Sequence, residues 1–435
     1  MKKIVFAINV FVCCLVYSVN GQDTLLSLTD CIGLAIKNNT ALLRNEIALS
    51  RADIRYKQAL NERLPTLGGN LSHGFSQGRS INPTTNQYVE ENNSYGNQSL
   101  VLNAPIFNGF AILHQIRKQS NAKEAGKLEF ESAVNTLKLD VIEAYVKVLT
   151  AEDMLKQTES QLLVTKEQLQ RQEVLNREGA VAPGDYYDLK GQYSAELNTL
   201  VQTEKSLKDA RIQLAGLLNI AEDTLPQLAS IEIPKEAPEY SADALYAQSL
   251  KIMPNIQALD WRIKEMEQGV KMAKSNYYPS LSLGAGLYSN YSKQGGDYFN
   301  QMKNNLSKSV SIGLSIPIFN KFSTKNQVKL AKLDLNEMLL TKQFEENELR
   351  KQTAQSVFDL KISQEHIQNL KQQEINYQEA FRIATVHFEA GNSNSVLYLT
   401  AKNKLDQAKS QLVIKQYEWI MQKYINDYYA GSLDL

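Results

Sequence analysis

The sequence predicts a mainly α-helical protein with a small β part, made of two similar halves. Three observations predict this fold class: landmarks that recur at a nearly constant offset, long stretches with heptad periodicity, and four short segments in which apolar and small polar residues alternate. The 47 basic and 47 acidic residues balance, and the chain has no basic block. This argues against nucleic acid as the main partner.

The amino terminus, residues 1–21, has the pattern of a secretory signal peptide. Lys2 and Lys3 precede an apolar run that extends to Val19, and small and polar residues follow it. A membrane anchor is the rival interpretation, but the run is short for a span and Asn9 interrupts it. The mature chain is therefore expected to be exported.

The cysteines place a limit on how the exported chain is stabilised. Cys13 and Cys14 lie inside the apolar run without a small residue before the first, which argues against lipidation. Cleavage leaves Cys31 as the one remaining cysteine, so no intramolecular disulfide can form.

An internal repeat organises the rest of the chain, with an offset of about 212 residues between its halves. The matched landmarks, in chain order, are Leu64–Leu67 with Tyr278–Leu281, Ala104–Asn108 with Ile316–Asn320, and Glu178–Gly179 with Ala390–Gly391. The proline-rich stretch 221–240 reads as a linker. We therefore expect a first repeat over residues 22–220 and a second over 241–435.

Each half is expected to begin with a helix of about 35 residues and to continue, after two strands, with one of about 70 residues. The expected helices are Thr29–Arg63 and Ala242–Tyr277, then Gly109–Arg177 and Lys321–Glu389. A glycine turn and another helix of about 35 residues follow in each half. In the first long helix, apolar residues recur every seven positions from Val134 to Leu169, which predicts coiled-coil packing.

Four short strands are expected between these helices. Their apolar positions are Leu67, Leu71 and Phe75; Leu100, Leu102 and Ala104; Leu281, Leu283, Ala285 and Leu287; and Val310, Ile312, Leu314 and Ile316. The alternating positions are mostly small or polar. One apolar face and one small polar face are typical of membrane β-barrel strands, but a soluble sheet packed on a helix has the same alternation.

The ends of the strands favour the membrane interpretation. An aromatic cluster lies at the helix–strand junctions, as expected of an interfacial girdle: Phe107, Phe110, Tyr277, Tyr278, Phe319 and Phe322. The opposite ends join through Gln77–Asn97 and Ser292–Asn305, which are rich in Asn, Gly, Ser and Gln, like external loops. Four strands cannot close a barrel, whereas three copies would supply about 12.

The chain resembles the TolC-like outer-membrane efflux proteins, the outer membrane factors, over essentially all of its mature length. The residues that carry the resemblance are the Asn38-Asn39-Thr40 helix start, the Leu64–Leu67 and Tyr278–Leu281 strand starts, the Pro-Ile-Phe-Asn motifs at Pro105 and Pro317, and the turns at Gly179 and Gly391. The resemblance implies a homotrimer whose 12-stranded outer-membrane barrel continues into a long periplasmic α-helical barrel. It also implies an exit duct, in the outer membrane of a Gram-negative bacterium, that works with a periplasmic adaptor and an inner-membrane transporter in efflux or type I secretion.

The resemblance also directs attention to the two glycine turns, at the expected periplasmic tip. The family often places acidic residues six and nine positions after the second glycine, where this chain has Leu397 and Thr400. Asp185 and Asp188 follow the first glycine instead and are the gate candidates, although Asp185 could simply cap the helix after Pro183. The candidate adaptor-docking residues are Gly179, Ala180, Val181, Gly391 and Asn392.

No catalytic constellation is apparent in the sequence. The four histidines have no metal-ligand spacing, and neither a phosphate-binding glycine loop nor a nucleophile elbow is present. The expectation is a protein without enzymatic activity, metal or cofactor. The rival to the duct is a soluble periplasmic coiled-coil scaffold or adaptor, which has no need of four lipid-facing alternations.

Overall fold

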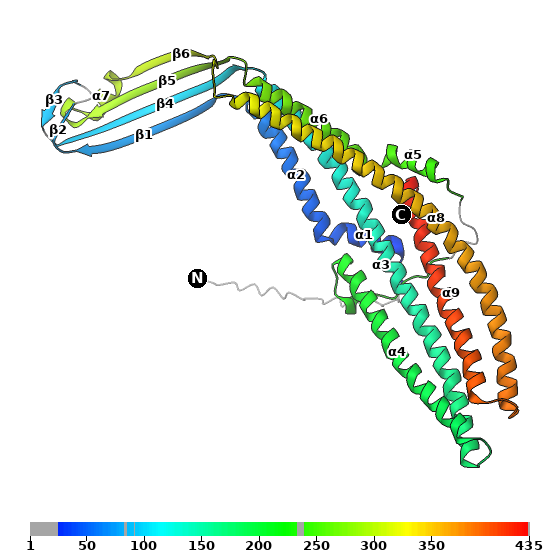
Figure 1. The fold of residues 1–435 in the computed structure, drawn as a ribbon. Coiled ribbons are helices and arrows are strands. Elements are labelled where there is room, and N and C mark those ends of the chain that lie inside the picture. The colour runs from blue at the N-terminus through cyan, green and yellow to red at the C-terminus, as the bar shows by residue number, and fades with distance from the viewer. Residues whose placement is uncertain (1–24, 82–84, 91, 233–238, 434–435) are drawn as a thin grey trace, which may run out of the picture.

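The computed structural model describes residues 25–81, 85–90, 92–232 and 239–433. The expected signal peptide, residues 1–21, and part of the expected linker lie outside the described residues. A small sheet occupies one end of the molecule, and long helices extend from it to the other end (Figure 1).

The elements of the first half alternate short and long helices around the sheet strands. In chain order they are α1 Leu28–Asn38, α2 Thr40–Asn61, β1 Thr66–Ser76, β2 Arg79–Ile81, β3 Tyr88–Glu90, β4 Asn93–Asn108, α3 Ala111–Arg177 and α4 Pro183–Leu218. The long helix α3 has 67 residues, which corresponds to about 100 Å. It packs against α2 near the sheet and against α4 toward the far end.

The second half follows the same order after the 3-10 helix η1, Glu222–Thr224. Its elements are α5 Ala242–Ile252, α6 Pro254–Ser275, β5 Ser280–Ser292, η2 Lys293–Gly295, α7 Tyr298–Asn304, β6 Ser307–Ser315, α8 Ser323–Glu389 and α9 Ser395–Ala430. The α-helices match the first half in length, with 67 residues in α8 and 36 in α9, as in α3 and α4.

Two of the expected helices are wrong as single elements, because each is divided in two. Asn39 has an extended backbone, and its side chain accepts hydrogen bonds from the amides of Ala41 and Leu42, so α1 ends and α2 begins there. Met253 is extended before Pro254, which occupies the first position of α6. The helix start expected at Asn38-Asn39-Thr40 is confirmed, but it divides the first expected helix instead of lying within it.

The main sheet has the order β1-β4-β5-β6, with every pair antiparallel. All four expected strands are confirmed. The expected loops are more ordered than predicted, because the first contains the β2–β3 hairpin and the second contains η2 and α7. The residue shift between Pro105 and Phe107 is a β-bulge that returns Phe107 to the face of Leu281.

The heptad prediction for α3 is confirmed, because Val141 and Val148 of the predicted row are fully buried. The main core lies at mid-length, where α1, α3, α4 and α9 meet around Tyr145 and Leu214. The Tyr145 hydroxyl lies 2.6 Å from the Ala229 carbonyl oxygen, which ties the segment after η1 to this core.

Candidate functional site

The sheet carries all its alternating apolar residues on one face. The register pairs Leu67 with Leu102, Leu102 with Ala285, and Ala285 with Val310 across the four strands. The opposite face carries mostly Ser, Gly and Asn, as in the pairs Ser99–Tyr288 and Gly286–Ser309. The strands thus form one continuous apolar surface and one small, polar surface.

The apolar face of the sheet is open to its surroundings rather than covered by a helical layer. Leu71 is 80% exposed and Val310 is 77% exposed; the long helices lie beyond one end of the sheet, and of the described α-helices only the short α7 lies at the other end (Figure 1). A soluble sheet would bury this face on a partner layer. The exposed apolar face therefore indicates contact with an apolar environment.

The predicted aromatic cluster lies where the sheet meets the helices. Phe107 and Phe110 form an edge-to-face pair with centroids 5.1 Å apart, and Phe319 and Phe322 form a matching pair at 5.5 Å. Phe110 and Phe322 both adopt left-handed backbone conformations at the residue that precedes the long helix. Tyr277 and Tyr278, between α6 and β5, are exposed at the same junction.

The two glycine turns lie at the end of the helices opposite the sheet. Gly179 and Gly391 have positive φ angles of 66° and 73°, which only glycine adopts readily, and each follows the end of a long helix. An added Cβ at either position would meet no atom within 4 Å. Ala180 and Asn392 are exposed, and Val181 is half-buried.

Asp185 and Asp188 both contact the start of α9 in the other hairpin. Asp185 Oδ1 accepts a hydrogen bond of 2.8 Å from the amide of Ser395, and Asp188 Oδ2 accepts one of 2.7 Å from the Ser395 hydroxyl. The alternative that Asp185 caps its own helix is wrong, because Ala182 is the N-cap of α4 and makes no side-chain bond. Asp185 instead places its carboxylate at the N-terminus of α9, where the helix dipole favours negative charge.

A buried ionic cluster connects α4 and α9 further from the tip, and the sequence did not reveal it. Lys402 Nζ donates to Glu196 Oε1 at 2.8 Å and to Asp406 Oδ2 at 2.6 Å, and the Lys402 side chain is 1% exposed. Burial raises the pKa of the Asp406 carboxyl above its usual range. Lys402 and Asp406 have the i, i+4 spacing of an ordinary surface ion pair on a helix. Only the packing of α4 against α9 shows that this pair is buried.

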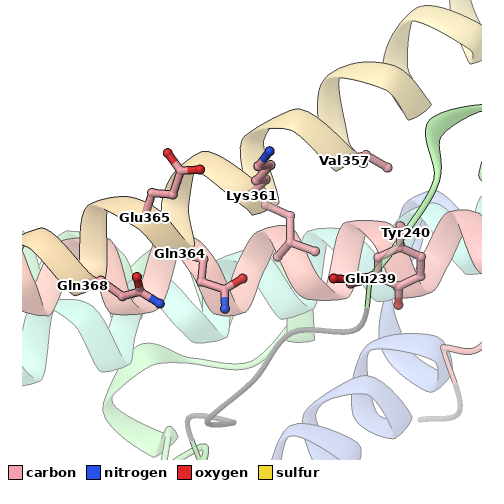
Figure 2. A pocket seen from close by; sticks show the side chains of 8 residues that line it. Glu239, Tyr240, Val357, Lys361, Gln364, Glu365 and Gln368 are labelled. Atoms are coloured by element: carbon pink, nitrogen blue, oxygen red, sulfur yellow. The ribbon is translucent and has the colours of Figure 1, made fainter.

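A cavity of about 380 Å³ lies at mid-length, between α8 and the segment that leads into α5. Figure 2 shows its side chains coming from one stretch of α8 and from Glu239–Tyr240. The α8 residues that line it are Val357, Leu360, Lys361, Gln364, Glu365 and Gln368. The Tyr240 hydroxyl donates to Asp427 Oδ1 at 2.6 Å, so it anchors this segment to α9. The lining has no nucleophile–base pair.

Within the described parts of the chain, no three His, Cys, Asp or Glu residues form a group that could hold a metal ion. Among the described helices, none combines the length and apolarity needed to cross a membrane.

Comparison with known proteins identifies the family. The model of the outer membrane efflux protein family matches residues 31–219 and 245–422. The chain is 23% identical over 410 residues to the outer membrane protein TolC of Salmonella enteritidis, covering 91% of this chain and 80% of TolC. It is 24% identical over 343 residues to the cobalt-zinc-cadmium resistance protein CzcC of Cupriavidus metallidurans, covering 77% of this chain and 78% of CzcC.

The fold agrees with that of solved channels. The outer membrane channel CmeC of Campylobacter jejuni superposes with a TM-score of 0.81 at 18% identity, covering 94% of this chain and 87% of CmeC. The family model covers most of the chain, and the exposed apolar sheet face and the long paired helices fit it. The chain belongs to the outer membrane efflux protein family.

Proposed function

We propose that three copies of this chain form a duct through which a periplasmic adaptor and an inner-membrane transporter pass substrates to the outside. The outer membrane of a Gram-negative bacterium is its location, and a large part of the chain extends into the periplasm. A tripartite efflux pump or a type I secretion system would use such a duct. The observation that carries the proposal is the exposed apolar face of a sheet that is open at both edges.

The topology of the sheet supports closure between copies. β1 runs away from the helices and β6 returns toward them, so β6 of one copy can pair antiparallel with β1 of the next. Unpaired edges cannot remain in lipid, because their backbone amides and carbonyls would have no partners. Three copies would close a hollow barrel of 12 strands, with four from each chain.

The helices offer matching surfaces at both lateral edges. Near the sheet the packing order is α2, α3, α6, α8, so α2 and α8 are the outer helices of each copy. Exposed apolar residues follow one face of each of these helices: Leu43, Ile47 and Ile54 on α2, and Leu330, Leu333, Leu340 and Phe344 on α8. Such stripes are the surfaces that neighbouring copies would bury when the helices form a continuous barrel.

The duct model gives each candidate site a role. Phe107, Phe110, Tyr277, Tyr278, Phe319 and Phe322 would form the periplasmic aromatic girdle. The turns at Gly179–Val181 and Gly391–Asn392 would meet the adaptor. Asp185 and Asp188 would hold the closed tip through Ser395. The equal helix lengths support the repeat boundaries 22–220 and 241–435, with residues 221–240 as the linker between them.

Membrane extraction and conductance test the proposal together. We expect the protein to remain in the outer membrane at alkaline pH, to purify as a trimer and to conduct ions in planar lipid bilayers. A soluble periplasmic scaffold, the alternative, would be released by alkali. A monomeric, water-soluble protein without conductance would refute the duct.

A further inference from the structure

Helix α7 exposes apolar residues and faces the protein with polar ones. Gln301 is buried, and its side-chain amide donates to the carbonyl of Ser292 at 2.8 Å. Phe299 is 76% exposed, and Met302, three residues further along α7, is also exposed. Leu306 is exposed as well, in the short segment between α7 and β6. In a surface helix exposed to water the apolar stripe would face the core, so this arrangement indicates an apolar environment outside the protein.

The hydrogen bonds of α7 place it on the apolar face of the sheet, at the end furthest from the long helices. The Tyr298 hydroxyl accepts from Gln98 Nε2 at 2.8 Å, and the Met302 carbonyl accepts from the Ser289 hydroxyl at 3.0 Å. Gln98 pairs in register with Leu71 and Ser289, so these residues share one face with the exposed leucines. Figure 1 shows α7 at the end of the sheet remote from the helices. The apolar stripe of α7 therefore continues the proposed lipid-facing surface.

The segment around α7 is positively charged. Lys293, Lys303 and Lys308 are exposed, and Asp297 is the one acidic residue between them. Among the described residues no carboxylate forms an ion pair with these lysines, because the Asp297 carboxylate accepts from the amide of Asn300 at 3.0 Å instead. Lys308 opposes Leu287 in the register, so it lies on the apolar face itself. A cation at the rim of an apolar surface is complementary to a lipid phosphate.

We propose that α7 and the start of β6 form a docking surface for the phosphate-bearing glycolipid of the outer leaflet, lipopolysaccharide. Phe299, Met302 and Leu306 contact the acyl chains, while Lys303 and Lys308 bind phosphate groups beside them. The proposal rests on the proposed function, which places the remote end of the sheet in the outer leaflet. It adds a specific lipid partner and the residues that bind it.

The position of α7 can be tested by fluorescence in nanodiscs that contain brominated lipid. Phe299→Trp on α7 and Ile312→Trp on β6 are compared after the signal of the native tryptophans, Trp261 and Trp419, is subtracted. We expect quenching of both introduced residues. Quenching of Ile312→Trp alone would overturn the α7 proposal and leave the duct intact, whereas quenching of neither would also refute the lipid-facing sheet.

The phosphate contacts are tested by titrating purified trimers with lipopolysaccharide. Each lysine near an anionic lipid surface contributes roughly a fivefold increase in affinity, so Lys303→Gln/Lys308→Gln should weaken binding roughly 30-fold. Lys329→Gln/Lys332→Gln, an equal charge change at exposed positions on α8, should leave the affinity unchanged. Equal loss in both double variants, or none in the first, would overturn the phosphate assignment. Equally tight binding of phosphatidylglycerol vesicles would overturn the choice of lipopolysaccharide.

Discussion

Replacing Lys402 with methionine should loosen the contact between α4 and α9. Lys402 Nζ lies 2.8 Å from Glu196 Oε1 and 2.6 Å from Asp406 Oδ2, so one ammonium group serves two carboxylates. Removing one partner of a buried ion pair costs about 3–5 kcal/mol. The Asp406 side chain is 20% exposed and can take up a proton, which relieves part of the cost. We therefore expect the contact between α4 and α9 to lose about 3 kcal/mol, which is roughly a 150-fold shift toward separated helices.

The assay is single-channel conductance of the purified trimer in planar lipid bilayers. The cluster begins 11 residues after Gly391, about 16 Å from the tip, where α4 and α9 would narrow the duct. We expect Lys402→Met to open more often and to a higher conductance than the wild type. The matched control is Lys404→Met, which removes the same charge from an exposed position of α9.

A rescue and a pH series separate the ionic cause from a general loss of packing. Lys402→Met/Glu196→Gln/Asp406→Asn removes the buried charges together and should recover most of the closed state. Burial raises the pKa of Asp406, so the protonated carboxyl favours the docked arrangement of α4 and α9. The stabilisation that the protonated carboxyl gives declines as the pH rises through that pKa. The defect of Lys402→Met should therefore shrink on acidification. Conductance of Lys402→Met equal to that of Lys404→Met, or no recovery in the triple variant, would refute the reasoning.

Three further predictions concern the sheet, the tip and the core. Ile312→Arg places a charge on the apolar face of β6 and should cost about 2–4 kcal/mol in the membrane, which lowers the yield of folded trimer on native gels. The control, Ser311→Arg, lies on the polar face and should leave the yield unchanged. Equal losses in the two variants would contradict the assignment of faces. Gly179→Trp and Gly391→Trp should abolish export while leaving trimers in the membrane, and intact drug resistance in both variants would argue against adaptor docking at these turns. Burial raises the pKa of the Cys31 thiol to about 12. The folded protein should therefore resist iodoacetamide at pH 9, where the unfolded chain reacts. Rapid labelling of the folded trimer at that pH would show that the thiol is accessible.

The strands and the long helices could be predicted because their signals are local. Alternation at Leu281, Leu283 and Leu287 depends only on the pleat of a strand, and the heptad from Val134 depends only on helix periodicity. The breaks at Asn39 and Met253 also have local signals, an N-cap residue and a following proline. The sequence indicates the first as a helix start, but the continuous apolar pattern favours one unbroken helix at each place.

Residues far apart in the chain form the features that sequence reasoning missed. Glu196 and Lys402 are separated by 206 positions, and each looks like a surface residue on its own helix. Tyr298 reaches Gln98 across 200 positions, which is why an expected irregular loop proves to contain a helix held on the sheet. Asp185 lies in the first turn of its own helix, α4, but its carboxylate accepts a hydrogen bond from the first backbone amide of α9, whose N-cap is Asn394.

By itself, the sequence determined the four main strands, the long helices, their order along the chain, and the apolar alternation that marks a lipid-facing surface. These features follow from the side-chain periods of 2 residues in a strand and 3.6 residues in a helix. Such periods are visible in neighbouring residues and do not depend on the rest of the fold. Only the tertiary structure decided that all four apolar rows share one face, that Lys402 lies buried between two carboxylates, and that α7 turns its apolar side outward. Each of these depends on which distant segments come together, and the free energy of such contacts has no signature in local periodicity.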